Sequence, residues 1–292
     1  MPLFKTLMVI GPGLIGSSIL RRARSTGQLA ERLIVMDKEP AVLKRIEELG
    51  LADSVTTEPA MAEEADCVVV SVPVRAIENV VRSLSPHLRP GTIITDVASV
   101  RGELDSSILS LLPHGVEYVP SHPMAGTEFS GPDAGFAELF ENRWALLIPT
   151  PETAPWACGK MQNFWEFCGA RVKFIKADEH DRICAMVSHL PHLLAFTICD
   201  TADNLSSEMR SAVLDYAASG FRDFTRIAAS DPVMWRDIFT ANRDVLLETL
   251  DRFLRDVQSM ADAIRDGDDD AITEKIKRGR SIRRTLIQNK QA

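Results

Sequence analysis

The sequence predicts an α/β domain over residues 1–176, followed by an all-α domain over residues 177–292. Short β-branched runs alternate with helical segments in the first part, which is typical of a doubly wound parallel sheet. After about residue 177 these runs vanish and long helical stretches replace them. A chain of 292 residues is also long enough to build two domains.

Strands are predicted where apolar runs recur in the first domain. The run CVVVSVPV at 67–74 is β-branched throughout and is typical of a strand that is buried on both faces. Helices are predicted at 14–27, ending at Gly27, and at about 40–49. The other predicted strands cover residues 6–11, 32–37, 92–97, 116–120, 144–150 and 171–175.

The second domain contains only helical patterns. In the segment FTANRDVLLETLDRFLRDVQSMADAI, apolar residues recur every three or four positions, which places them on one helix face. We therefore expect an amphipathic helix over several turns here. The predicted helices cover about 178–205, 208–220, 232–265 and 268–289.

Composition excludes several classes of protein. The formal net charge of −8 disfavours nucleic acid as a partner. Five cysteines without paired spacing indicate reduced thiols, so we expect a cytoplasmic protein. Since no continuous apolar run approaches 18 residues, no membrane span is expected.

The motif GPGLIG follows the first predicted strand and opens a helix, as in Rossmann-like dinucleotide-binding domains. Gly11 would allow the tight turn, Gly13 the approach of a pyrophosphate, and Gly16 the packing of the helix on the strand. Leu14 and Ile15 begin that helix, whose N–H groups would bind the pyrophosphate. A glycine turn without a ligand is the alternative.

The cofactor is expected to be NAD. Asp37 ends the second predicted strand, 21 residues after Gly16, where its carboxylate would accept hydrogen bonds from the ribose hydroxyls. A 2′-phosphate there would be repelled, although Lys38 weakens this argument. We also expect Ser71 and Pro73 to contribute to the cofactor site.

One histidine is held rigidly after a predicted strand. In VPSHPMAGTEFSG, Pro120 and Pro123 restrict the backbone on both sides of His122. Ser99 follows the strand predicted at 92–97. Since ligands of open parallel sheets bind beyond the carboxyl ends of the strands, both side chains should face the nicotinamide. His122 would then be a base that takes a hydroxyl proton; a structural histidine is the alternative.

Several segments together resemble the prephenate/arogenate, or cyclohexadienyl, dehydrogenases of tyrosine biosynthesis. The segments are GPGLIGSS, DVASVRGEL, VPSHPMAGTEFSGPDAGFAELF, SHLPHLLAF and GFRDFTRIAASDPVMWRDIF. The resemblance runs from residue 6 to about 265, and the final helix is not diagnostic.

This resemblance implies an NAD-dependent oxidative decarboxylation. Prephenate would give 4-hydroxyphenylpyruvate, or arogenate would give tyrosine, with CO2 and NADH. His122 would accept the proton of the substrate C4 hydroxyl, and Ser99 would hydrogen-bond that hydroxyl or hold the imidazole. Both substrates remain open, because they differ only in a keto or an amino group.

The resemblance also assigns substrate-binding residues. His192 would help to bind substrate, whereas His189 would be structural. Arg226 would meet the ring carboxylate, ordered by ion pairs with Glu128 and Asp223. The C-terminal helices would form a homodimer, with the amphipathic helix from 232 at its centre.

Two other functions and a metal site are less consistent with the sequence. His122, His189 and His192 could imitate a zinc site, but no further ligand has recognisable spacing and the redox chemistry needs no metal. A β-hydroxyacid dehydrogenase would need a catalytic lysine, which SGFRDFTR lacks. A non-catalytic NAD-sensing module would need no base at His122.

Overall fold

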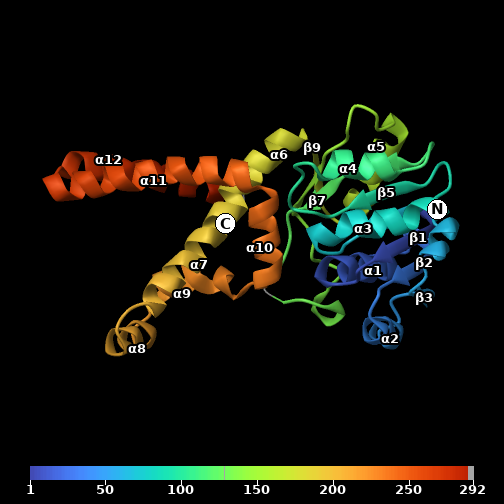
Figure 1. Cartoon of the computed structure of the whole chain (residues 1–292), viewed down its shortest axis with the longest axis horizontal. Helices are drawn as coiled ribbons and strands as arrows, with labels where there is room; N and C mark the ends of the chain where they lie inside the picture. The colour runs from blue at the N-terminus through green and yellow to red at the C-terminus, as the bar shows by residue number, and fades with distance from the viewer. Residues whose placement is uncertain (128, 289–292) are drawn as a thin grey trace. The chain divides into compact units, whose positions relative to one another are not determined.

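A computed structural model describes residues 1–127 and 129–288 of the chain (Figure 1). Its contacts divide the chain into two units, Met1–Arg243 and Asp244–Ala292. The sequence-based boundary between residues 176 and 177 falls inside the first unit and stays a prediction. Every site residue discussed below that the structure describes lies in the first unit.

The first unit contains a six-stranded sheet in which every neighbouring pair is parallel, as predicted. The strand order is β3-β2-β1-β4-β5-β6, so the chain reverses direction across the sheet between β1 and β4. Open α/β sheets bind ligands at such a switch point. The strands are β1 Phe4–Ile10, β2 Ala30–Met36, β3 Ser54–Thr56, β4 Cys67–Val70, β5 Ile93–Asp96 and β6 Glu117–Tyr118.

Helices cover both faces of this sheet. Leu7 and Val9 of β1 belong to one buried cluster, whereas Met8 and Ile10 belong to another. Since strand side chains alternate between faces, the two clusters are the two sides of the sheet. One cluster includes residues of α1 (Leu14–Thr26), α2 (Pro40–Glu48) and α5 (Pro155–Phe167). The other includes residues of α3 (Val74–Leu84), α4 (Leu104–Leu111) and the 3₁₀ turn η1 (Pro59–Glu64).

The last predicted strands form a separate sheet. It has the order β7-β8-β9, with β7 at Ser121–Pro123, β8 at Trp144–Leu147 and β9 at Arg171–Phe174. Prediction of one strand over 116–120 was therefore wrong in its extent, since β6 ends at Tyr118. Pro120 has no N–H to continue a ladder, and the chain passes there into the second sheet, where the Pro120 carbonyl accepts from Ile148 N at 2.9 Å.

The first unit continues as helices beyond β9. They are α6 Ala177–Cys184, the π-helical turn η4 Ala185–His189, α7 Leu190–Asp203, α8 Ser207–Asp215, α9 Ser219–Thr225, the 3₁₀ turn η5 Arg226–Ala229 and α10 Pro232–Ala241. Pro191 lies in the first turn of α7, directly after the π turn. Proline lacks the N–H for a regular helical hydrogen bond. The π turn before Pro191 lets the helical stretch continue past this residue without a break.

Among the residues that the structure describes, one helical stretch is long and apolar enough to cross a membrane, judged by its length and its composition alone. It is Ala177–Asp203, with 27 residues and a mean hydropathy of 1.4 in its most apolar window. The expectation that no segment spans a membrane rested on the lack of a continuous apolar run, whereas this window contains polar interruptions, so the expectation stays a prediction. The core helix of a soluble protein passes the same test, so this is weak evidence for a span.

The predicted helix over 232–265 is interrupted at Asn242. α10 ends at Ala241, and α11 runs from Arg243 to Asp266. The Asn242 side chain donates a hydrogen bond to the Asp181 carbonyl at 3.0 Å. The residue at the break between the two helices therefore helps to hold Asp181, which belongs to the site described below. α12 follows at Asp269–Gln288 and completes the all-α second part.

Candidate active site

The glycine loop after β1 has the geometry that its motif predicts. Gly11 has a φ of +73°, and a Cβ there would lie 2.6 Å from Cγ1 of Val72. A Cβ on Gly16 would lie 2.5 Å from Oγ of Ser71, so only glycine permits this packing. At Gly13 nothing lies within 4 Å of the Cβ position, which leaves the backbone open to a ligand. The loop therefore fits a dinucleotide pyrophosphate.

The residues around the loop complete the switch point. Leu14 and Ile15 form the first turn of α1, which contains no acidic residue to oppose an anion. Oγ of Ser71 donates a hydrogen bond to the Gly11 carbonyl oxygen at 2.8 Å. Pro73 is the N-cap residue of α3. Ser71 thus fixes the loop, and direct contact of Ser71 or Pro73 with the cofactor stays a prediction.

Asp37 lies at the carboxyl end of β2, as predicted. Its Oδ1 accepts a hydrogen bond from Glu39 N at 2.9 Å, which fixes the carboxylate at the sheet edge. Nζ of Lys38 lies 3.8 Å from a carboxylate oxygen of Glu39, so the negative charge of Glu39 partly offsets the positive charge of Lys38. This arrangement favours the discrimination against a 2′-phosphate that the sequence predicts.

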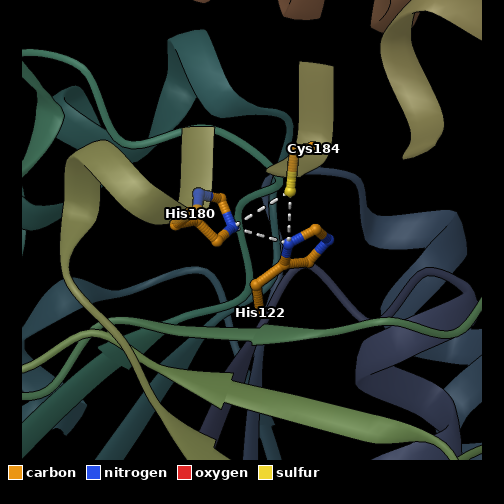
Figure 2. A group of neighbouring side chains, drawn as sticks. All are labelled: His122, His180 and Cys184. Atoms are coloured by element: carbon orange, nitrogen blue, oxygen red, sulfur yellow. Dashed lines mark hydrogen bonds between the residues drawn. The ribbon is translucent and has the colours of Figure 1, made fainter. Parts of the chain in front are cut away.

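His122 lies inside β7, opposite Leu146 of β8, and not just beyond a strand as the sequence suggested. Its Nδ1 is 2.8 Å from Nε2 of His180. Figure 2 shows its second ring nitrogen turned away from both His180 and Cys184. Burial, and next electrostatic repulsion from the neighbouring His180, Arg101 and His189 side chains, hold the pKa of His122 well below its usual value. A neutral imidazole with one outward nitrogen can act as a base.

Sequence reasoning missed the residues behind His122. Nδ1 of His180 is 2.8 Å from Oδ1 of Asp181, and both side chains are buried. Asp181 also accepts from the backbone N–H groups of Arg101 at 2.9 Å and Gly102 at 2.8 Å. The available signal was a His–Asp pair in ADEHDRIC, shortly before SHLPH on the same helical stretch.

The loop that carries Ser99 is anchored by a buried arginine. The Arg101 guanidinium contacts Oδ1 of Asp96 at 2.5 Å and Oδ1 of Asp105 at 3.2 Å. The Tyr118 hydroxyl donates to Oδ2 of Asp96 at 2.5 Å. Burial raises the pKa of Asp105 to about 6, against the attraction of Arg101. The network fixes residues 97–102, and Ser99 follows β5 as predicted.

His189 and His192 have different surroundings. His189 is fully buried, and its Nδ1 accepts from the Asn242 side chain at 3.1 Å. Burial lowers the pKa of His189 to about 4, which fits the structural role expected for it. His192 is half-buried, donates to the Ser188 carbonyl at 2.9 Å, and stacks on Trp235 with ring centroids 3.7 Å apart. Trp235 is a buried core residue.

Arg226 begins η5, which packs against the helix that carries His192. Burial lowers the pKa of His192, and the charge of Arg226 lowers it further, so the two side chains share one region. Asp223 is exposed in α9, one turn earlier. Glu128 lies outside the described residues. The ion pairs of Glu128 and Asp223 with Arg226 stay predictions.

Within the described part of the chain, the three histidines considered as an imitation of a zinc site, His122, His189 and His192, are not found as one cluster. Among the residues that the structure describes, donor atoms of His122, His180 and Cys184 instead lie within 4.8 Å of one another. Sγ of Cys184 is 3.4 Å from Nε2 of His180 and 3.7 Å from Nδ1 of His122. Such a triangle has the donor types of a soft-metal site, yet hydrogen bonds already account for its contacts.

Comparison with known proteins shows the family of the chain. Residues 21–174 match the family model for the prephenate dehydrogenase nucleotide-binding domain, and residues 176–278 match that for the prephenate dehydrogenase dimerization domain. A cyclohexadienyl dehydrogenase from Zymomonas mobilis is 38% identical over 289 residues, which is 98% of this chain and 97% of that protein. A prephenate dehydrogenase from Lactococcus lactis is 31% identical, over 99% of this chain and 79% of its own length.

A solved structure agrees over nearly the whole chain. The prephenate dehydrogenase from Aquifex aeolicus, in complex with hydroxyphenyl propionate and NAD+, has a TM-score of 0.90 and 30% identity. It covers 97% of this chain and 98% of its own. Since both family models match and these relatives cover nearly the whole chain, the chain belongs to the family of prephenate, arogenate and cyclohexadienyl dehydrogenases.

Proposed function

We propose that this enzyme oxidises and decarboxylates prephenate, arogenate or both with NAD, and that Nε2 of His122 is the base. The observation that carries the proposal is the ring nitrogen of His122 that is turned away from His180 and Cys184, on a strand, β7, that contacts β5 of the nucleotide-binding sheet. The complex of the Aquifex aeolicus enzyme with hydroxyphenyl propionate and NAD+ supports both the cofactor and the substrate class.

The cofactor would be held by the switch-point residues. The Gly13 backbone and the N–H groups that begin α1 would bind the pyrophosphate, and Asp37 would bind the ribose hydroxyls. Gly11, Gly16 and Ser71 would keep the loop in shape. When bound, NAD supplies the acceptor for the hydride that leaves C4 of the substrate.

His122 would take the C4-hydroxyl proton on Nε2 as the carbon–hydrogen bond breaks. Ser99 would orient that hydroxyl or the imidazole. His192 and Arg226 would hold the substrate from the helices, with the guanidinium on the ring carboxylate. The bond from the ring to that carboxylate then breaks, its electron pair enters the ring, and CO2 leaves. Aromatisation supplies the driving force, and the proton held by His122 returns to the C4 oxygen of the product, so the protein needs to position the substrate and hold one proton.

A homodimer and a cytoplasmic location complete the proposal. Exposed apolar side chains on α11 at Leu247, Leu254, Val257 and Ile264 repeat every three or seven residues, so they share a helix face. Together with the match to the dimerization model, this face supports a homodimer formed through the C-terminal helices. The reduced cysteines support a cytoplasmic location.

Absorbance at 340 nm tests the function directly. The purified protein is mixed with NAD and either prephenate or arogenate, and we expect NADH to form with at least one of them. A β-hydroxyacid substrate should give none. NAD binding without turnover of either cyclohexadienol would instead indicate the sensing module and would refute the proposal.

A further inference from the structure

Asp181 is built to stay ionised beside His180, on the side of that ring away from His122. Its Oδ1 accepts from Arg101 N and from the His180 ring, and its Oδ2 accepts from Gly102 N. Burial opposes ionisation, but the hydrogen bonds from His180, Gly102 and Arg101 outweigh it and lower the pKa of Asp181. At neutral pH this carboxylate can only accept hydrogen bonds.

This carboxylate fixes the tautomers of two histidines. Since Asp181 only accepts, Nδ1 of His180 must carry the proton of their 2.8 Å hydrogen bond. A neutral His180 then has a lone pair on Nε2, which lies 2.8 Å from Nδ1 of His122. Nδ1 of His122 must therefore donate, which leaves the lone pair of His122 on Nε2. Figure 2 shows this nitrogen as the one that faces away from the cluster.

We propose that His180 and Asp181 form a relay that sets the tautomer of His122 and shares its charge during the reaction. The inference rests on the proposed role of His122 as the base. When Nε2 of His122 takes the substrate proton, the Nδ1 proton can move to Nε2 of His180. The positive charge then lies against Asp181, and the protons balance without any further reactant.

His180 and Asp181 are positioning residues in this arrangement. His180 is fully buried, and its two ring nitrogens contact Asp181 and His122. Neither nitrogen is left to reach a substrate, so His180 acts through His122. Cys184 lies beside both rings but off this path. Burial, and next the charge of Asp181, raise the pKa of the Cys184 thiol to about 12, so it stays neutral.

Asp181→Asn is the variant that tests the relay. Its amide can donate to Nδ1 of His180, which would reverse both tautomers and place the proton on Nε2 of His122. We expect kcat to fall by about 10²-fold or more, with little change in substrate KM or NAD affinity. Cys184→Ser, in the same buried cluster, is the matched control and should keep kcat within threefold.

A double-variant cycle separates a relay from a structural effect. Asp181→Asn should cost nothing further in the His122→Asn background, because the group on which it acts is gone. An equal loss in both backgrounds would overturn the relay. If Asp181→Asn does not fold, His180→Gln and His180→Phe serve instead. The glutamine oxygen can still accept from His122, so Gln should retain more activity than Phe; equal kcat values would contradict the proposal.

The base, the relay and a metal site can be told apart by their effects on kcat. An active His122→Asn would refute the base itself, whereas an inactive His122→Asn with an unaffected Asp181→Asn would refute only the relay. Dialysis against EDTA should leave kcat unchanged. Loss of activity that Zn²⁺ restores would overturn the relay, since the three donor atoms would then hold a metal.

Discussion

Arg101 donates its backbone N–H to Oδ1 of Asp181 at 2.9 Å, while its own guanidinium is buried against Asp96. One residue therefore links the carboxyl end of β5 to the helix that carries His180. The loop between them includes Ser99. The position of His122, the predicted base, thus depends on the buried Arg101–Asp96 ion pair, through the hydrogen bonds of Asp181 and His180.

Replacing Arg101 should destabilise the fold strongly. Arg101→Leu would leave Asp96 and Asp105 buried without their cation, and loss of one partner of a buried pair costs about 3–5 kcal/mol. Urea unfolding followed by circular dichroism would measure the loss. Arg45→Ala, which removes an exposed pair with Asp133, is the control and should change stability little. Similar values for both variants would contradict the account.

The sequence predicted the cofactor half of the site better than the catalytic half. Gly11, Gly13 and Gly16 are local signals, because the motif, the strand and the helix are contiguous in the chain. The sequence also singled out His122, through its two prolines, and its role as the base stays a prediction. His180, which contacts His122, lies 58 residues later in the sequence, and the contact depends on how α6 packs against β7. No local pattern encodes that meeting.

The pH profile of kcat/KM should show a base with a depressed pKa. The neutral form of His122 would be the active one, and burial, followed by electrostatic repulsion from neighbouring side chains, lowers its pKa well below 6.5. Activity should therefore be level from pH 6.5 to 8 and should fall only at lower pH, as His122 protonates. An acid limb centred at or above 6.5, or no acid limb down to the pH of unfolding, would argue against this base.

NAD should be preferred over NADP because of Asp37. The carboxylate would repel a 2′-phosphate. Asp37→Ser removes that charge and should therefore lower the ratio of kcat/KM for NAD to kcat/KM for NADP. Measurement of kcat/KM for each cofactor tests this for the wild type and the variant. Equal wild-type values for NAD and NADP would refute the assignment.

Arg226 should act mainly in substrate binding. A guanidinium forms two parallel hydrogen bonds with a carboxylate, which lysine does not reproduce. Arg226→Ala should raise substrate KM by about 10- to 150-fold, and Arg226→Lys should recover only part of that loss. NAD affinity should not change. Arg236→Ala is the control, since Arg236 pairs with Asp237. An unchanged KM in Arg226→Ala would remove Arg226 from the site.

The kinetics of His122→Asn test the central claim most directly. Asparagine keeps a polar side chain in β7 but removes the ring nitrogen that would accept the substrate proton. We expect kcat to fall by about 10²–10⁴-fold, with the thermal unfolding midpoint and the NAD dissociation constant close to wild type. A variant that turns over within threefold of the wild type would show that His122 is not the base.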